Sequence, residues 1–218
     1  YFGTGRYFYE IGANTDDPTN QRKLLGIPEP CFDSVTGEFN TSCTTPDGAP
    51  AQVALTSEAG VTDNTNGWYI DLDPANSPTT SFANCNGVGT TTCPANQYGY
   101  CEGNPASIVC RDYKAERVVT DPLATGSGIV FFITYKPYAE ECSLGGKSFI
   151  WATKYDTGAA AGTLLKGKAL VQVSTGAIEQ MDLSTAFSEK GGRRTSAIEG
   201  VPPTAQGLSI VSTPPALK

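Results

Sequence analysis

The sequence predicts an all-β protein. Its 218 residues include 24 Gly and 15 Pro, so turns should be frequent and long helices few. Short runs of β-branched and aromatic residues recur along the chain, separated by turn signals at intervals of roughly eight to twelve residues. This spacing favours a sandwich, a barrel or a propeller over a parallel α/β sheet.

The chain divides into three zones. In the first zone, residues 1–30, YFGTGRYFYE and QRKLLGI are expected strands joined by the polar turn ANTDDPTN. Residues 31–112 are rich in Cys, Gly, Asn and Thr, and their expected strands are AQVAL at 51–55 and GWYIDL at 67–72. We expect residues 1–30 and 113–218 to form a β-scaffold, with residues 31–112 as a disulfide-stapled insertion packed on it.

Residues 113–218 carry the clearest strand patterns. RVVTDP and GIVFFITY flank a Gly-containing turn, and SFIWATKY runs into a D-T-G turn. KALVQVSTGAIEQMDL holds two further runs, and LSIVS, framed by prolines, is expected to be a closing edge strand.

Composition excludes several classes of function. The chain contains no His, which removes Ser-His-Asp and Cys-His catalysis and His-ligated metals. Its net charge of −7 argues against nucleic acid or anionic membrane as the main partner. The apolar runs are too short for a membrane span, which needs about 20 residues. The one tight basic pair, Arg193-Arg194, is expected in a solvated loop.

Seven cysteines point to an oxidising compartment, periplasmic or extracellular. Six are disulfide candidates and one is a candidate unpaired thiol: Cys31, Cys43, Cys85, Cys93, Cys101 and Cys110, and Cys142. No C-x-x-C occurs, so a zinc ribbon is not expected. The simplest pairing is local, Cys31–Cys43, Cys85–Cys93 and Cys101–Cys110, but six cysteines allow about 15 connectivities. Cys142 is either a buried small hydrophobe or a link to another chain or to a missing part of this one.

A succession of five segments resembles the C-terminal region of the PilY family, the type IV pilus tip-associated adhesins. The segments are YFGTGRYF, QRKLLGI, GWYIDL, ERVVTDPL with GIVFFITYKP, and CSLGGKSFIWAT with D-T-G, and the resemblance covers about residues 1–30 and 67–160. It implies incomplete or modified β-propeller blades. In these blades Gly3 and Gly5 allow strands to approach closely, and Tyr1, Phe2, Tyr7 and Phe8 pack between sheets.

The resemblance also implies a function. It predicts an extracellular or cell-surface adhesin or pilus-biogenesis factor, exported through the periplasm, that binds surfaces and is not an enzyme. Expected partners are minor pilins or the pilus tip, and a missing N-terminal part of the same precursor, because the sequence begins without Met or a signal peptide. Calcium is implied by the resemblance alone.

The residues themselves offer no catalytic, cofactor or metal site. Oxygen donors that suit calcium occur at Asp63, Asn64, Asn66, Asp71 and Asp73, but Gly67 follows Asp63 too soon for an EF-hand, and a turn explains Asn66-Gly67 more simply. Glu140-Glu141 are adjacent loop residues rather than a glycosidase pair. The alternative function is a structural subunit of an extracellular filament or sheath that assembles by strand addition.

Overall fold

The computed structural model confirms the all-β class. It describes residues 1–5, 10–11, 14–15, 20–29, 31–33, 35–43, 48–75, 82–83, 90–91, 98–102, 107–111, 113–138, 146–172, 178–200 and 208–211. Helix in these ranges is limited to a 3₁₀ turn, Gly162–Leu164, and one short helix, α1, Leu183–Ala186. No helix in the described part of the chain is long and apolar enough to cross a membrane.

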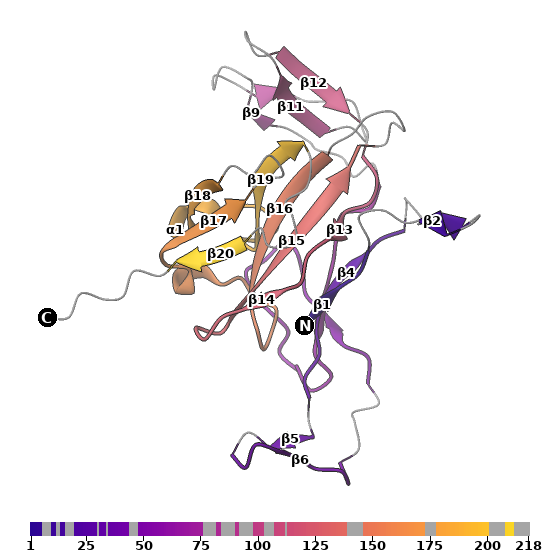
Figure 1. The fold of residues 1–218 in the computed structure, drawn as a ribbon, viewed down its shortest axis with the longest axis vertical. Helices are drawn as coiled ribbons and strands as arrows, with labels where there is room; N and C mark the ends of the chain where they lie inside the picture. The colour runs from indigo at the N-terminus through magenta and orange to yellow at the C-terminus, as the bar shows by residue number, and fades with distance from the viewer. Residues whose placement is uncertain are drawn as a thin grey trace, which may run out of the picture.

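Two long antiparallel strands form the centre of the molecule (Figure 1). Strands β15, Ile129–Pro137, and β16, Gly146–Lys154, pair over nine residues, from Ile129 opposite Lys154 to Pro137 opposite Gly146. Three further strands complete their sheet: β13, Arg117–Val118, β14, Leu123–Ala124, and β19, Arg194–Gly200. All but the last residue of β15 and of β16 are buried, so this sheet is covered on both faces.

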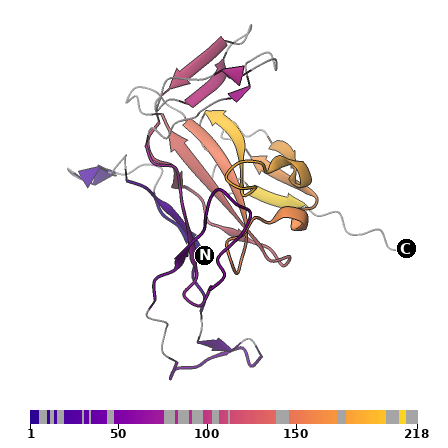
Figure 2. The same cartoon turned by 180° about the vertical axis from the view of Figure 1, so that it is seen from behind.

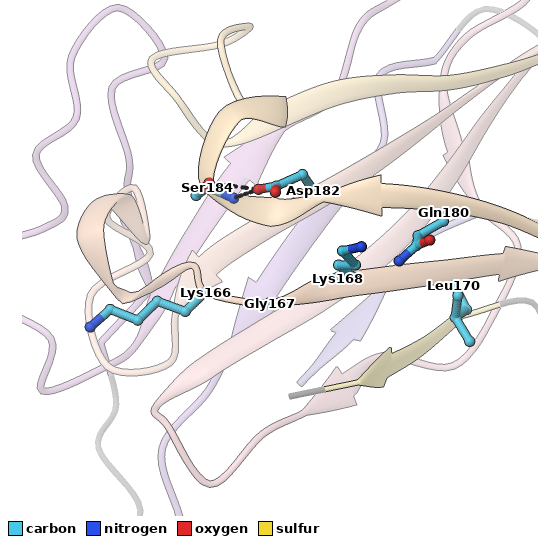
Figure 3. Close-up of a pocket in the computed structure, with 7 residues that line it drawn as sticks. All are labelled: Lys166, Gly167, Lys168, Leu170, Gln180, Asp182 and Ser184. Carbon is cyan, nitrogen blue, oxygen red and sulfur yellow. Dashed lines mark hydrogen bonds between the residues drawn. The ribbon is translucent and has the colours of Figure 1, made fainter. Parts of the chain in front are cut away.

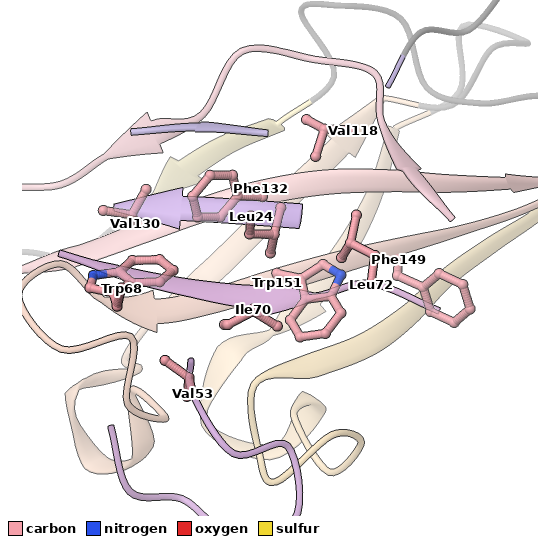
Figure 4. Packing of buried hydrophobic residues seen from close by; sticks show 10 residues of the cluster. All are labelled: Leu24, Val53, Trp68, Ile70, Leu72, Val118, Val130, Phe132, Phe149 and Trp151. Atoms are coloured by element: carbon pink, nitrogen blue, oxygen red, sulfur yellow. The ribbon is translucent and has the colours of Figure 1, made fainter. Parts of the chain in front are cut away.

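A second sheet covers one face of the central sheet. Its strand order is β1-β4-β8-β7, with β7 parallel to β8 and the other pairs antiparallel. The bounds are Phe2–Gly3 for β1, Lys23–Gly26 for β4, Ala51–Gln52 for β7 and Trp68–Asp71 for β8. Alternate residues of the two sheets form the first core (Figure 4), made of Leu24, Val53, Trp68, Ile70, Leu72, Val118, Val130, Phe132, Phe149 and Trp151.

The other face of the central sheet packs against C-terminal elements. Strands β17, Lys168–Gln172, β18, Ile178–Asp182, and β20, Leu208–Val211, form an antiparallel sheet in the order β18-β17-β20. The second core consists of Ile129, Phe131, Ile150, Ala152, Ala161, Leu165, Ala169 and Leu183. Figures 1 and 2 show β1 and β4 on one side of the β15–β16 pair and β17, β18 and β20 on the other, so the body has three layers.

Within the described ranges, four two-stranded hairpins lie outside these three sheets. They are β2 with β3, Glu10–Ile11 and Asn14–Thr15; β5 with β6, Phe32–Asp33 and Glu38–Phe39; β9 with β10, Phe82–Ala83 and Thr90–Thr91; and β11 with β12, Tyr98–Glu102 and Ser107–Arg111. The described residues do not close into a propeller ring. Blade architecture therefore stays a prediction.

Gly3 and Gly5 lie where strands approach closely, as expected. A Cβ on Gly3 would lie 2.0 Å from Cγ2 of Val118, and one on Gly5 would lie 2.4 Å from Cβ of Arg117. The Val118 amide donates to the Thr4 carbonyl at 3.1 Å, so the first strand bridges two sheets. The expected packing of Tyr1 and Phe2 between sheets is wrong, because both side chains are exposed. Tyr7 and Phe8 lie outside the described residues.

Most of the predicted strands that fall in the described ranges are present. The runs at 21–27 and 67–72 contain β4 and β8, those at 128–135 and 148–155 contain most of β15 and β16, and LSIVS contains β20, which is an edge strand of its sheet. Asp156-Thr157-Gly158 forms the turn after β16, with Gly158 at φ +64°. Residues 51–73 lie in the range expected as an insertion, yet their side chains make up four members of the first core, Val53, Trp68, Ile70 and Leu72.

Candidate functional site

The first predicted cysteine pair is present. Cys31 and Cys43 form a disulfide with Cα atoms 5.3 Å apart. Cys101 and Cys110 lie on β11 and β12, where Cys101 is opposite Ile108 and Cys110 is opposite Gly99. Their side chains, like Cys85, Cys93 and Cys142, lie outside what the structure describes, so these pairings and the unpaired thiol stay predictions.

The oxygen donors of residues 63–73 serve separate purposes. Asp63 accepts hydrogen bonds from the amide and hydroxyl of Thr65, at 3.0 and 2.7 Å. Asp71 pairs with Lys23 at 2.6 Å. Gly67 has φ +86° and its amide donates to the Asn64 carbonyl at 2.9 Å, which confirms the turn before β8. Within the described ranges, no three acidic or Cys side chains group in a way that could hold a metal.

A disulfide-braced hairpin projects from the body. It comprises residues 31–43, the Cys31–Cys43 hairpin, in which β5 and β6 pair Phe32 with Phe39 and Asp33 with Glu38. Figure 1 shows β5 and β6 well away from the packed sheets. Every described residue from 32 to 42 is exposed. This hairpin therefore contributes nothing to either core.

Three apolar side chains of the Cys31–Cys43 hairpin face solvent. Val35 is 92% exposed, Phe39 65% and Phe32 44%. The two phenyl rings contact each other, with centroids 5.2 Å apart. The sequence of residues 29–43 also contains Glu29, Asp33 and Glu38 and no Lys or Arg. The hairpin is thus both apolar and negatively charged.

Local hydrogen bonds fix the tip of the hairpin. The Asp33 carboxylate accepts from the amides of Val35 at 2.8 Å and Thr36 at 3.3 Å, and these bonds lower the pKa of Asp33. Gly37, at φ +72°, donates its amide to the Asp33 carbonyl at 2.8 Å. At the base, the Asn40 amide donates to the Cys31 carbonyl at 2.8 Å. The tip is therefore held in one shape without help from the body.

A cluster of charged side chains is buried between the first two layers. Arg194 donates from Nη1 to Asp73 and to Glu116, each at 2.9 Å, and from Nη2 to Glu189 at 2.9 Å. Its guanidinium lies 3.9 Å from the centroid of the Phe149 ring. Lys190 pairs with Asp73 at 2.7 Å. Side chains from four separate segments therefore meet at one end of the first core.

The carboxylates of Asp73 and Glu116 are each engaged through both oxygens. Glu116 is fully buried, and its carboxylate accepts from the indole of Trp151 at 2.9 Å and from the hydroxyl of Thr134 at 2.5 Å. Burial by itself would raise the pKa of Asp73, but the charges of Arg194, Lys136 and Lys190 outweigh it and hold that pKa far below its usual range. An ionised, fully paired carboxylate is a poor proton donor, so this arrangement ties layers together rather than offering a reacting group.

Sequence reasoning missed most of this cluster. The signal lay in the alternation of β15, where Thr134 and Lys136 continue the inward face begun by Val130 and Phe132. Lys136 is buried, and its Nζ lies 3.7 Å from Asp73. Burial lowers the pKa of Lys136. A charged residue on a core-facing position predicts a buried partner of opposite sign.

The expectation that Arg193-Arg194 forms a solvated loop is wrong. Both side chains are buried. Arg193 donates to the backbone carbonyls of Gly158 at 2.8 Å, Ala54 at 3.0 Å and Ser57 at 2.6 Å, and also to that of Ala59. The Arg193 guanidinium can be buried because its N–H donors bond to backbone carbonyl oxygens in place of water. Arg193 thereby fastens the 54–59 loop to the turn after β16.

Several pockets open on the surface. The one in Figure 3 has a volume of about 600 Å³ and lies on the outer face of β17 and β18. Lys168 and Gln180 lie side by side there, whereas Lys166 extends away. Lys168 is opposite Asp182 across the strand pair, and Asp182 also accepts from the amide and hydroxyl of Ser184, at 2.9 and 2.6 Å. The carboxylate of Asp182 is therefore already engaged by Ser184.

Comparisons with known proteins identify no relative. No family model matches the chain. No curated protein and no solved structure matches it either.

Proposed function

We propose that the chain is part of an extracellular, pilus-associated adhesin or pilus-biogenesis factor that acts by binding surfaces and carries out no catalysis. The observation that carries this proposal is the Cys31–Cys43 hairpin. It projects from a rigid three-layer body and exposes Phe32, Phe39 and Val35. A binding segment held out by a rigid scaffold is a common arrangement in recognition proteins.

A hairpin that keeps apolar side chains exposed to water is unfavourable unless those side chains bind a partner. Single exposed apolar residues are ordinary, but this one short projection exposes three, and two of them are aromatic rings in contact with each other. A disulfide that closes a loop of this size contributes about 3 kcal/mol by restricting the unfolded chain. That restriction also means that the hairpin loses less conformational entropy when it binds a partner. The acidic groups beside it favour a partner surface with Lys or Arg next to apolar side chains.

The compartment and the partners follow from two further supports. A disulfide between Cys31 and Cys43 fits an oxidising environment outside the cytoplasm. The order of segments that resembles the PilY family favours minor pilins or the pilus tip as partners. On this proposal the sheets are the last blades of a modified propeller, completed by an N-terminal part of the same precursor. We therefore expect the intact mass of the native protein, measured after reduction, to lie far above 22.9 kDa.

The test removes the two exposed aromatic rings of the hairpin. Cells that display the full-length protein are compared with cells that carry the double variant Phe32→Ser/Phe39→Ser, and surface attachment is counted at equal display. We expect attachment to fall at least about tenfold, because buried aromatic anchors carry most of the energy of a contact. Cys31→Ser/Cys43→Ser should also weaken attachment, since it leaves the aromatic rings in place but frees the hairpin.

The matched control is Leu164→Ser, which removes a side chain as exposed as Phe32, at 44%, from the 3₁₀ turn. It should leave attachment unchanged. Equal attachment of the double variant and wild type would reject the hairpin as the contact surface. If the isolated protein instead polymerised by itself and were as abundant as a filament subunit, the filament alternative would replace the adhesin proposal.

A further inference from the structure

A second concave site lies where the hairpin leaves the body. It has a volume of about 390 Å³, within the range of about 300–1,000 Å³ that small-ligand pockets occupy. Its walls come from the first residue, from the end of β4, from the turn before β8 and from the turn after β16. Four segments distant in sequence therefore converge on it, and none of them belongs to residues 31–43.

Two glycines keep the floor of this pocket free of side chains. A Cβ on Gly26 would lie 2.3 Å from Cε2 of Trp68, and a Cβ on Gly67 would lie 2.2 Å from the Gly26 carbonyl oxygen. Trp68 is fully buried beneath and donates its indole N–H to the Tyr155 carbonyl at 3.0 Å. The floor is thus backbone packed on a fixed indole, so the hollow is built into the fold.

Two tyrosines form aromatic walls. Tyr155 is 53% exposed and Tyr1 is 43% exposed. The Tyr155 ring rests against Gly128, with Cδ1 only 3.3 Å from where a Cβ of Gly128 would lie, and the Tyr155 amide donates to the Gly128 carbonyl at 3.0 Å. Burial, together with nearby Tyr155 and Asp156, raises the pKa of Tyr1, which agrees with polar groups that converge on one place.

The polar groups of the pocket are mixed donors and acceptors. The Asn64 amide donates to the Asp156 carbonyl at 3.2 Å, which positions its side chain across the turn. The Asp156 carboxylate accepts from the Thr157 hydroxyl at 3.1 Å through Oδ1. Among the residues that line the pocket, Asp156 is the one carboxylate, and there is no Lys or Arg. The side chains of this lining therefore offer nothing to neutralise an anionic ligand.

We propose that this pocket binds a neutral sugar residue of a glycan, with the C–H face of the pyranose ring on Tyr155 and its hydroxyl groups on Asp156 and Asn64. A pyranose has an apolar face and a rim of groups that both donate and accept, which matches half-exposed aromatic rings beside a carboxylate and an amide. An ammonium group only donates and is much smaller than the pocket. The site is separate from the Cys31–Cys43 hairpin and does not depend on the function proposed for it.

Saturation-transfer NMR on the full-length protein tests this site with methyl glycosides of glucose, galactose, mannose and N-acetylglucosamine at millimolar concentration. We expect saturation of ring C–H protons for at least one of them. Tyr155→Ala should weaken binding about tenfold, in line with the energy of one aromatic contact, whereas Tyr155→Phe should retain most of it. Asp156→Asn should weaken binding while thermal unfolding stays unchanged, because Asp156 is on an exposed turn.

The control is Phe32→Ser/Phe39→Ser, which should bind sugar as wild type does. Loss of attachment with sugar binding intact would support both sites separately, and intact attachment with intact sugar binding would reject the hairpin alone. No saturation transfer for any glycoside, or wild-type binding by Tyr155→Ala, would overturn the sugar site. Preference for tetramethylammonium or for a uronic acid over every neutral glycoside would also overturn it.

Discussion

At the scale of single residues, Arg194 shows how charge can join two layers of a core. Its guanidinium pairs with the largely buried Asp73 and the fully buried Glu116, and it stacks on Phe149. Removing one partner of a buried ion pair leaves the others uncompensated, which costs far more than the pair itself contributes. Arg194 is therefore a residue whose loss should be felt by the whole body.

We predict that Arg194→Met lowers the free energy of unfolding by about 3–5 kcal/mol. The matched control is Lys23→Met, which breaks the ion pair with Asp71 at the surface, where Lys23 is 42% exposed. That pair should be worth at most about 1 kcal/mol. Urea unfolding of both variants gives the comparison. Equal losses would mean that the buried cluster does not hold the layers together.

The pH dependence of stability should report Asp73. Its pKa in the folded protein is held below that of the unfolded chain, about 3.9, so the folded state binds fewer protons there. The stabilisation is therefore complete above about pH 5 and is lost as the pH falls through 4 and below. Asp73→Asn should be less stable than wild type at pH 7 and should lose less between pH 5 and 3. Parallel urea midpoints for the two proteins over that range would contradict this.

Residue-scale prediction from sequence succeeded where a property of the residue itself was enough. The Asn66-Gly67 turn and the close approach at Gly3 needed only the properties of glycine. Arg193-Arg194 was misjudged because its partners are remote: Arg194 meets Asp73 across a separation of 121 residues. In the sequence, a buried pair of basic residues surrounded by carbonyls and carboxylates cannot be told from a pair exposed to water.

At the scale of elements, strand β1 depends on close contact with Val118. It holds only Phe2–Gly3, with both large side chains at 1 and 2 exposed, so side-chain burial contributes little to its docking. Backbone hydrogen bonds to β4 and between Thr4 and Val118 hold it instead. These bonds require that Gly3 carry no side chain.

We predict that Gly3→Ala destabilises the protein by about 1–3 kcal/mol, because the new methyl group would overlap Val118 and push β1 off the sheet. Gly126→Ala is the control, since its Cβ would meet nothing within 4 Å. Amide exchange of Thr4 and Val118 should accelerate in the first variant and not in the second. Unchanged exchange in Gly3→Ala would mean that the strand tolerates the clash by shifting.

Element prediction worked best for long, uniform runs. The run 128–135 contains most of β15 because eight successive buried positions demand β-branched and aromatic residues. Pairs as short as β5 and β6 have no such signal, and only the spacing of Cys31 and Cys43 pointed to that hairpin. The stretch 51–73 was grouped with an insertion because polar loops surround it, although Trp68 and Ile70 are fully buried.

At the scale of the whole molecule, the central sheet is a layer shared by two cores. Phe131 and Phe132 are neighbours on β15, yet Phe131 packs in the second core and Phe132 in the first. A strand buried on both faces cannot separate from one neighbour without exposing its other side. The three layers should consequently unfold in one cooperative step.

The two tryptophans offer a direct test, because Trp68 and Trp151 both lie in the first core and neither lies in the second. Phe132→Ala and Phe131→Ala should each cost about 3–5 kcal/mol. If the cores unfold together, Phe131→Ala will shift the tryptophan fluorescence midpoint in urea as far as Phe132→Ala does, although it removes a side chain from the opposite face.

The exposed Phe39→Ala is the control, and it should change stability by no more than about 0.5 kcal/mol. A fluorescence midpoint that moves with Phe132→Ala and stays fixed with Phe131→Ala would instead mean that the C-terminal layer is a separate unit, which the body can lose without losing the charge cluster at Arg194.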